Sequence, residues 1–205
     1  MRLVLASASP ARLAVLRAAG VQPVVRVSGV DEEAISAALP GASPEELVTA
    51  LARAKADAVA AGIAAEYPDG VVIGCDSMLH IGGELVGKPG CAEVALRRWR
   101  QLAGSTGELL TGHAVVRLRA GSRWASASGT QPTLIRFGSP SEAEIEAYVG
   151  TGEPLAVAGG FTLDGLGGWF VDGIDGDPSS VVGISLPLTR RLLAEVGVPV
   201  VSLWS

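Results

Sequence analysis

The chain opens on Met1-Arg2-Leu3-Val4-Leu5-Ala6-Ser7-Ala8-Ser9-Pro10-Ala11-Arg12. The apolar run Leu3–Leu5 is typical of a short strand that is buried on both faces. Ser9 is a favourable helix N-cap, and Pro10 loses nothing at the first helical position by lacking an N–H group. The stretch therefore predicts a strand that turns directly into a helix, which is the building unit of α/β folds.

The same turn has the properties of an anion site. Free backbone N–H groups and the positive end of the helix dipole meet where Ser7 and Ser9 lie, and Arg12 adds a full positive charge in the first turn. We therefore consider a phosphate site here. The alternative is an ordinary strand–helix junction with a good cap, and this stretch taken alone favours that alternative.

Composition indicates a folded protein without a membrane span. Of the 205 residues, 48% are hydrophobic and 18% are charged, so we expect residues 1–205 to form a single domain. The length allows one sizeable domain or two small lobes. No apolar run is long enough to cross a bilayer. The net charge of −5 argues against a general binder of nucleic acid or of anionic membranes.

The cysteines and histidines exclude two further classes. Cys75 and Cys91 have neither a metal-site spacing nor a disulfide framework, which fits a reducing compartment and predicts a cytoplasmic location. His80 and His113 are too few for a histidine-rich metal site. His113 is better interpreted as a hydrogen-bonded strand residue than as a base.

Alternating strand and helix patterns predict a mixed α/β sheet. The run Val71–Asp76 is apolar and ends on a carboxylate, which predicts a buried strand with Asp76 at its tip. The other predicted elements are a helix from Pro44 to about Ala61, a hairpin over 78–86, a helix over 92–102, strands over 109–118 and 123–137, a helix over 187–196 and a final strand over 198–203.

Four charged residues are candidates for chemistry. Asp76 stands where open α/β sheets bind ligands, although a turn or N-cap aspartate is an equal alternative. Lys88 is held between Gly87 and Pro89, and its alternative is a solvated turn lysine. Lys55 and Glu32, taken alone, fit solvated surface residues better.

In combination these motifs are far more specific. The chain strongly resembles the Maf family, the septum-formation-inhibitor-like nucleoside triphosphate pyrophosphatases. The resemblance is carried, in order, by Ser7-x-Ser9-Pro10-x-Arg12, Asp31-Glu32, Ala54-Lys55-Ala56, Gly74-Cys75-Asp76-Ser77, Gly87-Lys88-Pro89, Thr111-Gly112, Asp175-Gly176-Asp177 and Val182-Gly183.

The resemblance implies an elongated α/β fold with two lobes around a cleft, as in inosine triphosphate pyrophosphatases, and a homodimer. It implies hydrolysis of a nucleoside triphosphate to the monophosphate and pyrophosphate, with a divalent cation such as Mg²⁺ or Mn²⁺. The roles that it implies are proton acceptor or metal ligand for Asp76, metal-side acid for Glu32, and triphosphate binding for Ser7, Ser9, Arg12, Lys55 and Lys88.

Two departures from the family pattern bear on the substrate. Where the family commonly has two arginines after Ser-Pro, Ala11 replaces the first, so phosphate binding depends more heavily on Arg12. In the family branch that prefers dTTP and UTP, a threonine and a glutamine stand at the positions of Ser77 and Asp164. Because a carboxylate only accepts hydrogen bonds, Asp164 would suit the N–H donors of guanine better than the carbonyl edge of a pyrimidine.

A function from a different class stays open at this point. The chain could be a nucleotide-binding regulator of septum formation with little or no hydrolysis, and Ala11 is the feature that favours this alternative. A structural α/β scaffold would leave the combination of Arg12, Lys55, Asp76 and Lys88 unexplained.

Overall fold

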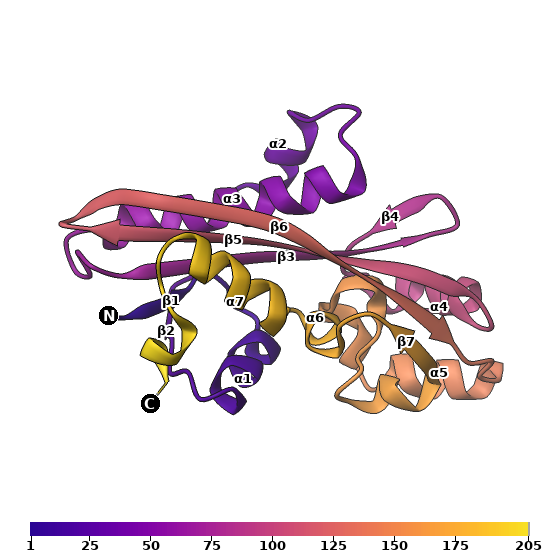
Figure 1. Ribbon diagram of the computed structural model, residues 1–205. Helices are drawn as coiled ribbons and strands as arrows, with labels where there is room; N and C mark the ends of the chain where they lie inside the picture. The colour runs from indigo at the N-terminus through magenta and orange to yellow at the C-terminus, as the bar shows by residue number, and fades with distance from the viewer. Residues whose placement is uncertain (205) are drawn as a thin grey trace. The chain divides into compact units, whose positions relative to one another are not determined.

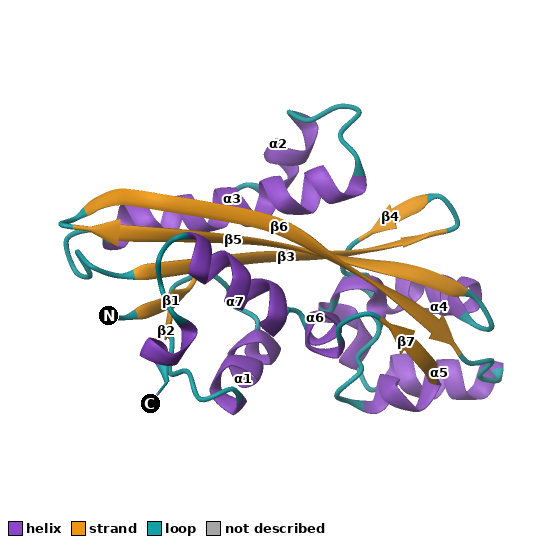
Figure 2. Cartoon of the chain, viewed as in Figure 1, coloured by secondary structure: helices purple, strands orange, loops and turns teal. Residues whose placement is uncertain are grey.

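A computed structural model describes residues 1–204 of the chain. The helices and strands alternate as the sequence predicts (Figures 1 and 2). The strands are β1 (Leu3–Leu5), β2 (Val24–Val25), β3 (Val71–Ile81), β4 (Glu84–Val86), β5 (Thr106–Arg119), β6 (Ser122–Phe137) and β7 (Val171–Asp175). The α-helices are α1 (Pro10–Ala18), α2 (Glu32–Ala37), α3 (Pro44–Ile63), α4 (Ala92–Leu102), α5 (Glu142–Gly150), α6 (Pro178–Val182) and α7 (Leu186–Glu195). Four short 3₁₀ helices are also described: η1 (Glu153–Ala156), η2 (Ala158–Gly160), η3 (Leu166–Phe170) and η4 (Val200–Leu203).

The strands form one seven-stranded mixed sheet, in the order β2-β1-β3-β5-β6-β7 with β4 paired to β3. Strand β1 is parallel to both of its neighbours, whereas β4 is antiparallel to β3 and β7 is antiparallel to β6. Helices flank this sheet, which confirms the predicted α/β class.

The chain folds into two compact units, each assembled from separate segments. The first unit comprises Met1–Asp76, Thr111–Gln131 and the chain from Gly183 onward, and the second comprises Ser77–Leu110 and Pro132–Val182. Strands β3, β5 and β6 have residues in both units. The expectation of a single domain over residues 1–205 stays a prediction.

The first unit is a sheet with a core on each face. Leu3 and Leu5 of β1 pack with α1 and α7, whereas Val4 between them packs with α3 on the opposite face (Figure 1). Successive strand side chains point to opposite faces, so a short run of three buried residues supplies both cores. This explains why β1 has no polar residue.

The second unit has its own core around Trp99 of α4. The ring of Trp99 makes edge-on contacts with Phe137, Tyr148 and Phe170, at centroid distances of 6.0, 5.2 and 5.7 Å. Its indole N–H donates a 2.7 Å hydrogen bond to the carbonyl of Gly160, which satisfies the one polar atom of this buried side chain. Helices α4 and α5 contact each other in this unit (Figure 2).

Two predictions of secondary structure are wrong: the end of one strand and the type of the last element. Asp76 does not end a strand, because β3 continues to Ile81, where Ile81 pairs with Glu84 of β4 across the Gly82-Gly83 turn. The predicted last strand over 198–203 is instead η4, where the N–H of Ser202 donates to the carbonyl of Pro199. Such a turn bond closes the backbone that a strand would have kept extended.

None of the helices in residues 1–204 is both long and apolar enough to span a membrane.

Candidate active site

The N-terminus of α1 is built as the sequence predicts. The hydroxyl of Ser9 accepts a hydrogen bond from the backbone N–H of Arg12, and Pro10 occupies the first turn. The hydroxyl of Ser7, which is buried, accepts from the N–H of Ser9 at 3.2 Å. The two serines therefore order the loop between β1 and α1 before any ligand is present.

The side chain of Arg12 is held over this loop by oxygen acceptors from three parts of the chain. Its Nη1 donates to the Ser7 hydroxyl at 3.0 Å and to the carbonyl of Cys75 at 2.9 Å, and its Nε donates to the carbonyl of Gly183 at 2.8 Å. Gly183 has a φ of +127° and a Cβ there would lie 3.2 Å from Arg12, so glycine suits this position. The guanidinium group thus has a fixed position at the end of α1.

Lys55 lies between two carboxylates. Its ammonium nitrogen is 2.6 Å from Oδ1 of Asp76 and 2.8 Å from Oε1 of Glu32. Lys55 and Asp76 are both buried, whereas the side chain of Glu32 is half exposed at the start of α2. The prediction of a solvated helix lysine, favoured for Lys55 alone, is wrong, because the charge is needed beside Asp76.

Burial raises the pKa of Asp76 above its ordinary value, and the opposing charges of Lys55 and Arg12 only partly offset this. A carboxylate with a raised pKa is a stronger base, and so a better proton acceptor from water, than an ordinary aspartate. Its Oδ2 atom is buried and has no hydrogen-bond partner within residues 1–204. A buried carboxylate oxygen without a partner is costly, so this atom is the one left to contact a water molecule, a cation or substrate.

Two glycines bring Lys55 to Asp76. Helix α3 lies so close to the sheet that a Cβ at Gly74 of β3 would be 2.3 Å from the carbonyl oxygen of Ala52, and a Cβ at Gly112 of β5 would be 2.2 Å from that of Val48. No real structure tolerates such distances. The absence of side chains at Gly74 and Gly112 therefore sets the depth at which α3 carries Lys55 over the sheet.

The residues fit a divalent cation that is completed by its substrate. Among residues 1–204, no group of three or more His, Cys, Asp and Glu side chains could hold a metal ion unaided. Glu32 and Asp76 nevertheless contact the same ammonium nitrogen of Lys55 from two elements, so their carboxylates lie close together, and Mg²⁺ is typically held by one or two carboxylates together with phosphate oxygens and water. The free Oδ2 of Asp76 supplies a suitable hard oxygen ligand.

The structure groups six of the nine predicted site residues in the first unit. Ser7, Ser9 and Arg12 surround the start of α1, and Lys55, Asp76 and Glu32 form the charged cluster beside it; the carbonyl of Cys75 joins the two groups. Ser77, Lys88 and Asp164 lie in the second unit, on β3, after β4 and in the loop before η3. Lys88 and Asp164 are exposed, and Ser77 is half-buried.

His113 is buried on β5 and has a structural role, as the sequence predicts. Its Nε2 accepts a 2.8 Å hydrogen bond from the N–H of Ser185, and its Nδ1 lies 2.9 Å from the carbonyl of Thr111. These two contacts assign the ring hydrogen to Nδ1. Ser185, the N-cap of α7, follows Gly183 closely in the chain, so His113 also supports the turn that holds Arg12.

This support could not be predicted from local patterns. Gly183 belongs to the Val182-Gly183 motif, but the contacts of Gly183 with Arg12 and of Ser185 with His113 join positions far apart in the chain.

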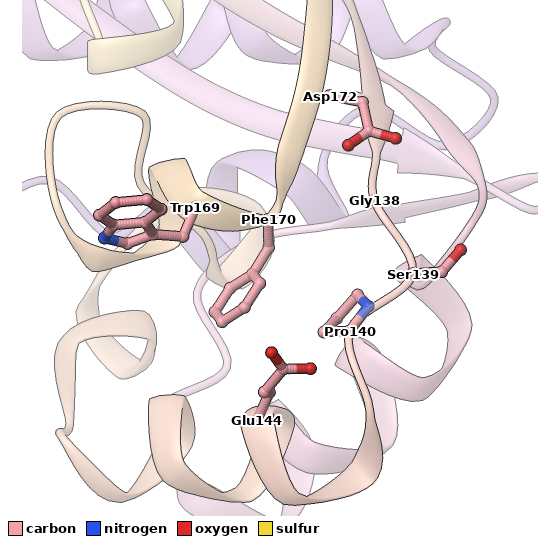
Figure 3. Close-up of a pocket in the computed structure, with 7 residues that line it drawn as sticks. All are labelled: Gly138, Ser139, Pro140, Glu144, Trp169, Phe170 and Asp172. Carbon is pink, nitrogen blue, oxygen red and sulfur yellow. The ribbon is translucent and has the colours of Figure 1, made fainter.

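A surface pocket of about 410 Å³ lies in the second unit, and none of the predicted site residues lines it. It is lined by Gly138, Ser139, Pro140, Glu144, Trp169, Phe170 and Asp172. Figure 3 shows Glu144 pointing from α5 toward Phe170. Trp169 is 86% exposed.

Comparison with known proteins gives the same assignment as the motifs. The model of the family described as Maf-like protein matches residues 2–196. A relative from Saccharopolyspora erythraea is 66% identical over 205 residues, covering 100% of this chain and 97% of the relative. A relative from Nocardia farcinica is 62% identical over 203 residues, covering 98% of this chain and 96% of the relative.

A third relative, from Mycolicibacterium gilvum, is 56% identical over 206 residues, covering 100% of this chain and 99% of its own. All three relatives are named nucleoside triphosphate pyrophosphatase. The family match spans both the start of α1 and the strand that carries Asp76. The chain belongs to the Maf family.

Proposed function

We propose that this protein is a nucleoside triphosphate pyrophosphatase, which hydrolyses a nucleoside triphosphate to the monophosphate and pyrophosphate. The observation that carries the proposal is the position of Lys55 between Asp76 and Glu32. Asp76 follows Cys75 on β3, and the carbonyl of Cys75 holds Arg12. Relatives that align over the whole chain carry this activity in their names. A regulator without hydrolysis is not favoured by those names.

Asp76 is the proton acceptor in this mechanism. Water attacks the α-phosphorus, the anhydride bond to the β-phosphate breaks, pyrophosphate leaves, and the proton of the water passes to the carboxylate of Asp76. The burial that raises the pKa of Asp76 supports this role, because a raised pKa makes the carboxylate a stronger base.

Lys55 and Arg12 supply positive charge for the triphosphate. Phosphoryl transfer depends mostly on positioning and on neutralising charge, and both cations have fixed positions in the structure. Ser7 and Ser9 are assigned to the triphosphate by the family resemblance, and the positive end of the α1 dipole favours a phosphate beside them; the N–H groups of Ser9 and Arg12 are already bonded to the two serine hydroxyls. Lys88 is assigned to the triphosphate on motif order alone.

Asp76 and Glu32 would hold the divalent cation, Mg²⁺ or Mn²⁺. When bound, the cation supplies charge neutralisation on the phosphate oxygens and lowers the pKa of a bound water. We also propose that the protein is cytoplasmic and homodimeric, as its family resemblance implies, and light scattering of the purified protein would measure the second property.

The base is selected by Asp164 and Ser77 in this proposal. An exposed carboxylate at 164 would accept hydrogen bonds from the N1–H and N2–H₂ groups of guanine and would repel the carbonyl oxygens of uracil and thymine. Turnover of GTP, 7-methyl-GTP, dTTP and UTP with Mg²⁺ or Mn²⁺ tests it. A preference for dTTP and UTP would rule out this assignment of Asp164.

The activity itself is tested by pyrophosphate release from wild type and Asp76→Asn. We expect Asp76→Asn to lose at least about 100-fold in kcat, the usual contribution of a general base, while still binding nucleotide. Asp57→Asn is a matched control, because Asp57 is a half-buried acid paired with Arg123 on the same unit. Nucleotide binding by the wild type without turnover under any metal would contradict the proposal.

A further inference from the structure

The carboxylate of Glu153 is the centre of a hydrogen-bond network in the second unit. Its Oε1 accepts hydrogen bonds from the hydroxyls of Tyr148 and Thr162 and, at 3.1 Å, from the N–H of Gly167. Its Oε2 accepts from the N–H of Leu166 at 3.1 Å. Burial raises the pKa of Glu153, but these hydrogen bonds lower it by more, so the carboxylate is stabilised in its charged form.

Two of these donors are the first N–H groups of η3. The N-cap position of η3 is Gly165, which has no side chain to accept from Leu166 or Gly167. A Cβ at Gly165 would lie 2.8 Å from both carboxylate oxygens of Glu153. Glu153 therefore caps this helix from a distant position in the chain, and Gly165 is the residue that makes room for it.

Both ends of the segment 162–167 are consequently hydrogen-bonded to the carboxylate of Glu153. Thr162 donates to Glu153 and also accepts from the N–H of Gly167 at 3.1 Å. Gly167 is buried, and a Cβ there would lie 2.6 Å from the hydroxyl of Tyr148. Between these two fixed ends, Asp164 projects as an exposed residue of a loop that is only a few residues long.

The support beneath Glu153 is rigid. The ring of Tyr148, whose hydroxyl donates to Glu153, packs edge-on against Trp99 and Phe170 in the core of this unit. Phe170 is the last residue of η3, so the capped helix is attached to the same aromatic cluster. The network therefore couples the loop to a core and not merely to a neighbouring loop.

We infer that Glu153 is a positioning residue for base selection, because it fixes the 162–167 loop on which Asp164 is carried. The inference rests on the proposed function, in which Asp164 contacts the base of the substrate. Glu153 itself touches no substrate in this account. By holding the loop in one conformation, it keeps Asp164 from moving away from an unsuitable base. It thereby determines how strongly the carboxylate discriminates between guanine and a pyrimidine.

The test compares wild type, Glu153→Gln, Asp164→Asn and the double variant by kcat/KM for GTP and for dTTP. Loss of a charge-assisted hydrogen bond typically corresponds to about 10-fold or more, so we expect the GTP to dTTP ratio to fall by about that factor in Glu153→Gln. General damage to the fold would lower both values equally and leave the ratio unchanged. In the Asp164→Asn background, Glu153→Gln should change the ratio by less than about two-fold, since residues that act through one another are not additive.

A second measurement does not depend on activity. Hydrogen exchange of the amides of Leu166 and Gly167 should be faster in Glu153→Gln than in wild type, whereas Glu144→Gln, a capping glutamate of the same unit, should leave both amides unchanged. Thr162→Val removes one donor while keeping the carboxylate, and we expect it to shift the ratio in the same direction by a smaller factor.

The outcomes separate the inference from the function beneath it. Without pyrophosphate release from wild type, the proposed function fails. If Asp164→Asn leaves the ratio unchanged, the base contact fails and this inference with it, while the hydrolytic activity stands. If Asp164→Asn changes the ratio but Glu153→Gln does not, the inference alone is overturned.

Discussion

A Cβ atom at Gly74 would lie 2.3 Å from the carbonyl oxygen of Ala52, so Gly74→Ala cannot be accommodated without moving α3. Because Lys55 follows Ala52 on that helix, the movement would draw its ammonium group away from Asp76. We expect a loss of about 1–3 kcal/mol in the free energy of unfolding, as is typical of an overpacked core, together with a lower kcat. Denaturant unfolding and pyrophosphate release measure the two effects.

Gly62→Ala is the matched control for this prediction. Gly62 lies on α3 as well, but a Cβ there would meet nothing within 4 Å. Alanine has the higher helix propensity, so the variant should gain about 0.5–1 kcal/mol in stability and keep full activity. If both glycine variants behaved alike, the close approach at Gly74 would not be the cause.

Removing Lys55 should destabilise the protein, because the buried carboxylate of Asp76 would lose its ion-pair partner. In Lys55→Met the carboxylate loses its cation, its pKa rises further, and we expect a cost of about 3–5 kcal/mol, the usual penalty for an unpaired buried charge. The double variant Lys55→Met/Asp76→Leu should regain most of this stability and remain inactive. A double variant no more stable than Lys55→Met would contradict the account of the pair.

Arg12→Lys tests the fixed guanidinium group at the start of α1. A lysine cannot reproduce the planar set of bonds to Ser7, Cys75 and Gly183. We expect KM for the triphosphate to rise by about 10-fold or more, from the loss of charge-assisted hydrogen bonds, with a smaller change in kcat. Arg17→Lys, near the other end of the same helix, should leave both constants at their wild-type values.

The stabilising effect of Glu153 should depend on pH in one direction. Its pKa in the folded protein is below the ordinary value, so the charged carboxylate stabilises the fold at pH values above the pKa of the unfolded chain. The stability is lost as the pH falls through the folded pKa, because the carboxyl group is then protonated in both states. The difference in Tm between wild type and Glu153→Gln should be largest near neutral pH and should shrink on acidification below about pH 4. A difference that grows on acidification would show the opposite sign.

Much of the fold follows from local signals in the sequence. The apolar run Leu3–Leu5 and the N-cap at Ser9 each act on their immediate neighbours, and the structure confirms the strand and the helix that they predict. The end of β3 could not be predicted in this way, because the chain passes Asp76 without a break and the strand is prolonged by pairing with β4.

The chemistry of the site was predictable only as a set of residue types. Motif order pointed to Lys55 and Asp76, but their 2.6 Å contact depends on how closely α3 packs on the sheet, which is set by Gly74 and Gly112. Glu153 gave no signal, because a glutamate before a proline on a polar stretch is ordinary. Its donors are brought to it by the tertiary structure.

The three oxygen acceptors of Arg12 have a thermodynamic consequence for ligand binding. An arginine side chain on a surface samples many rotamers, and a ligand that captures it must offset the entropy that is lost. Here the side chain of Arg12 already loses that entropy during folding, because two carbonyls and a hydroxyl, all neutral, accept its hydrogen bonds. Calorimetry should therefore find that the conformational entropy penalty of triphosphate binding grows when Ser7 is replaced by alanine, since the arginine then regains part of its motion.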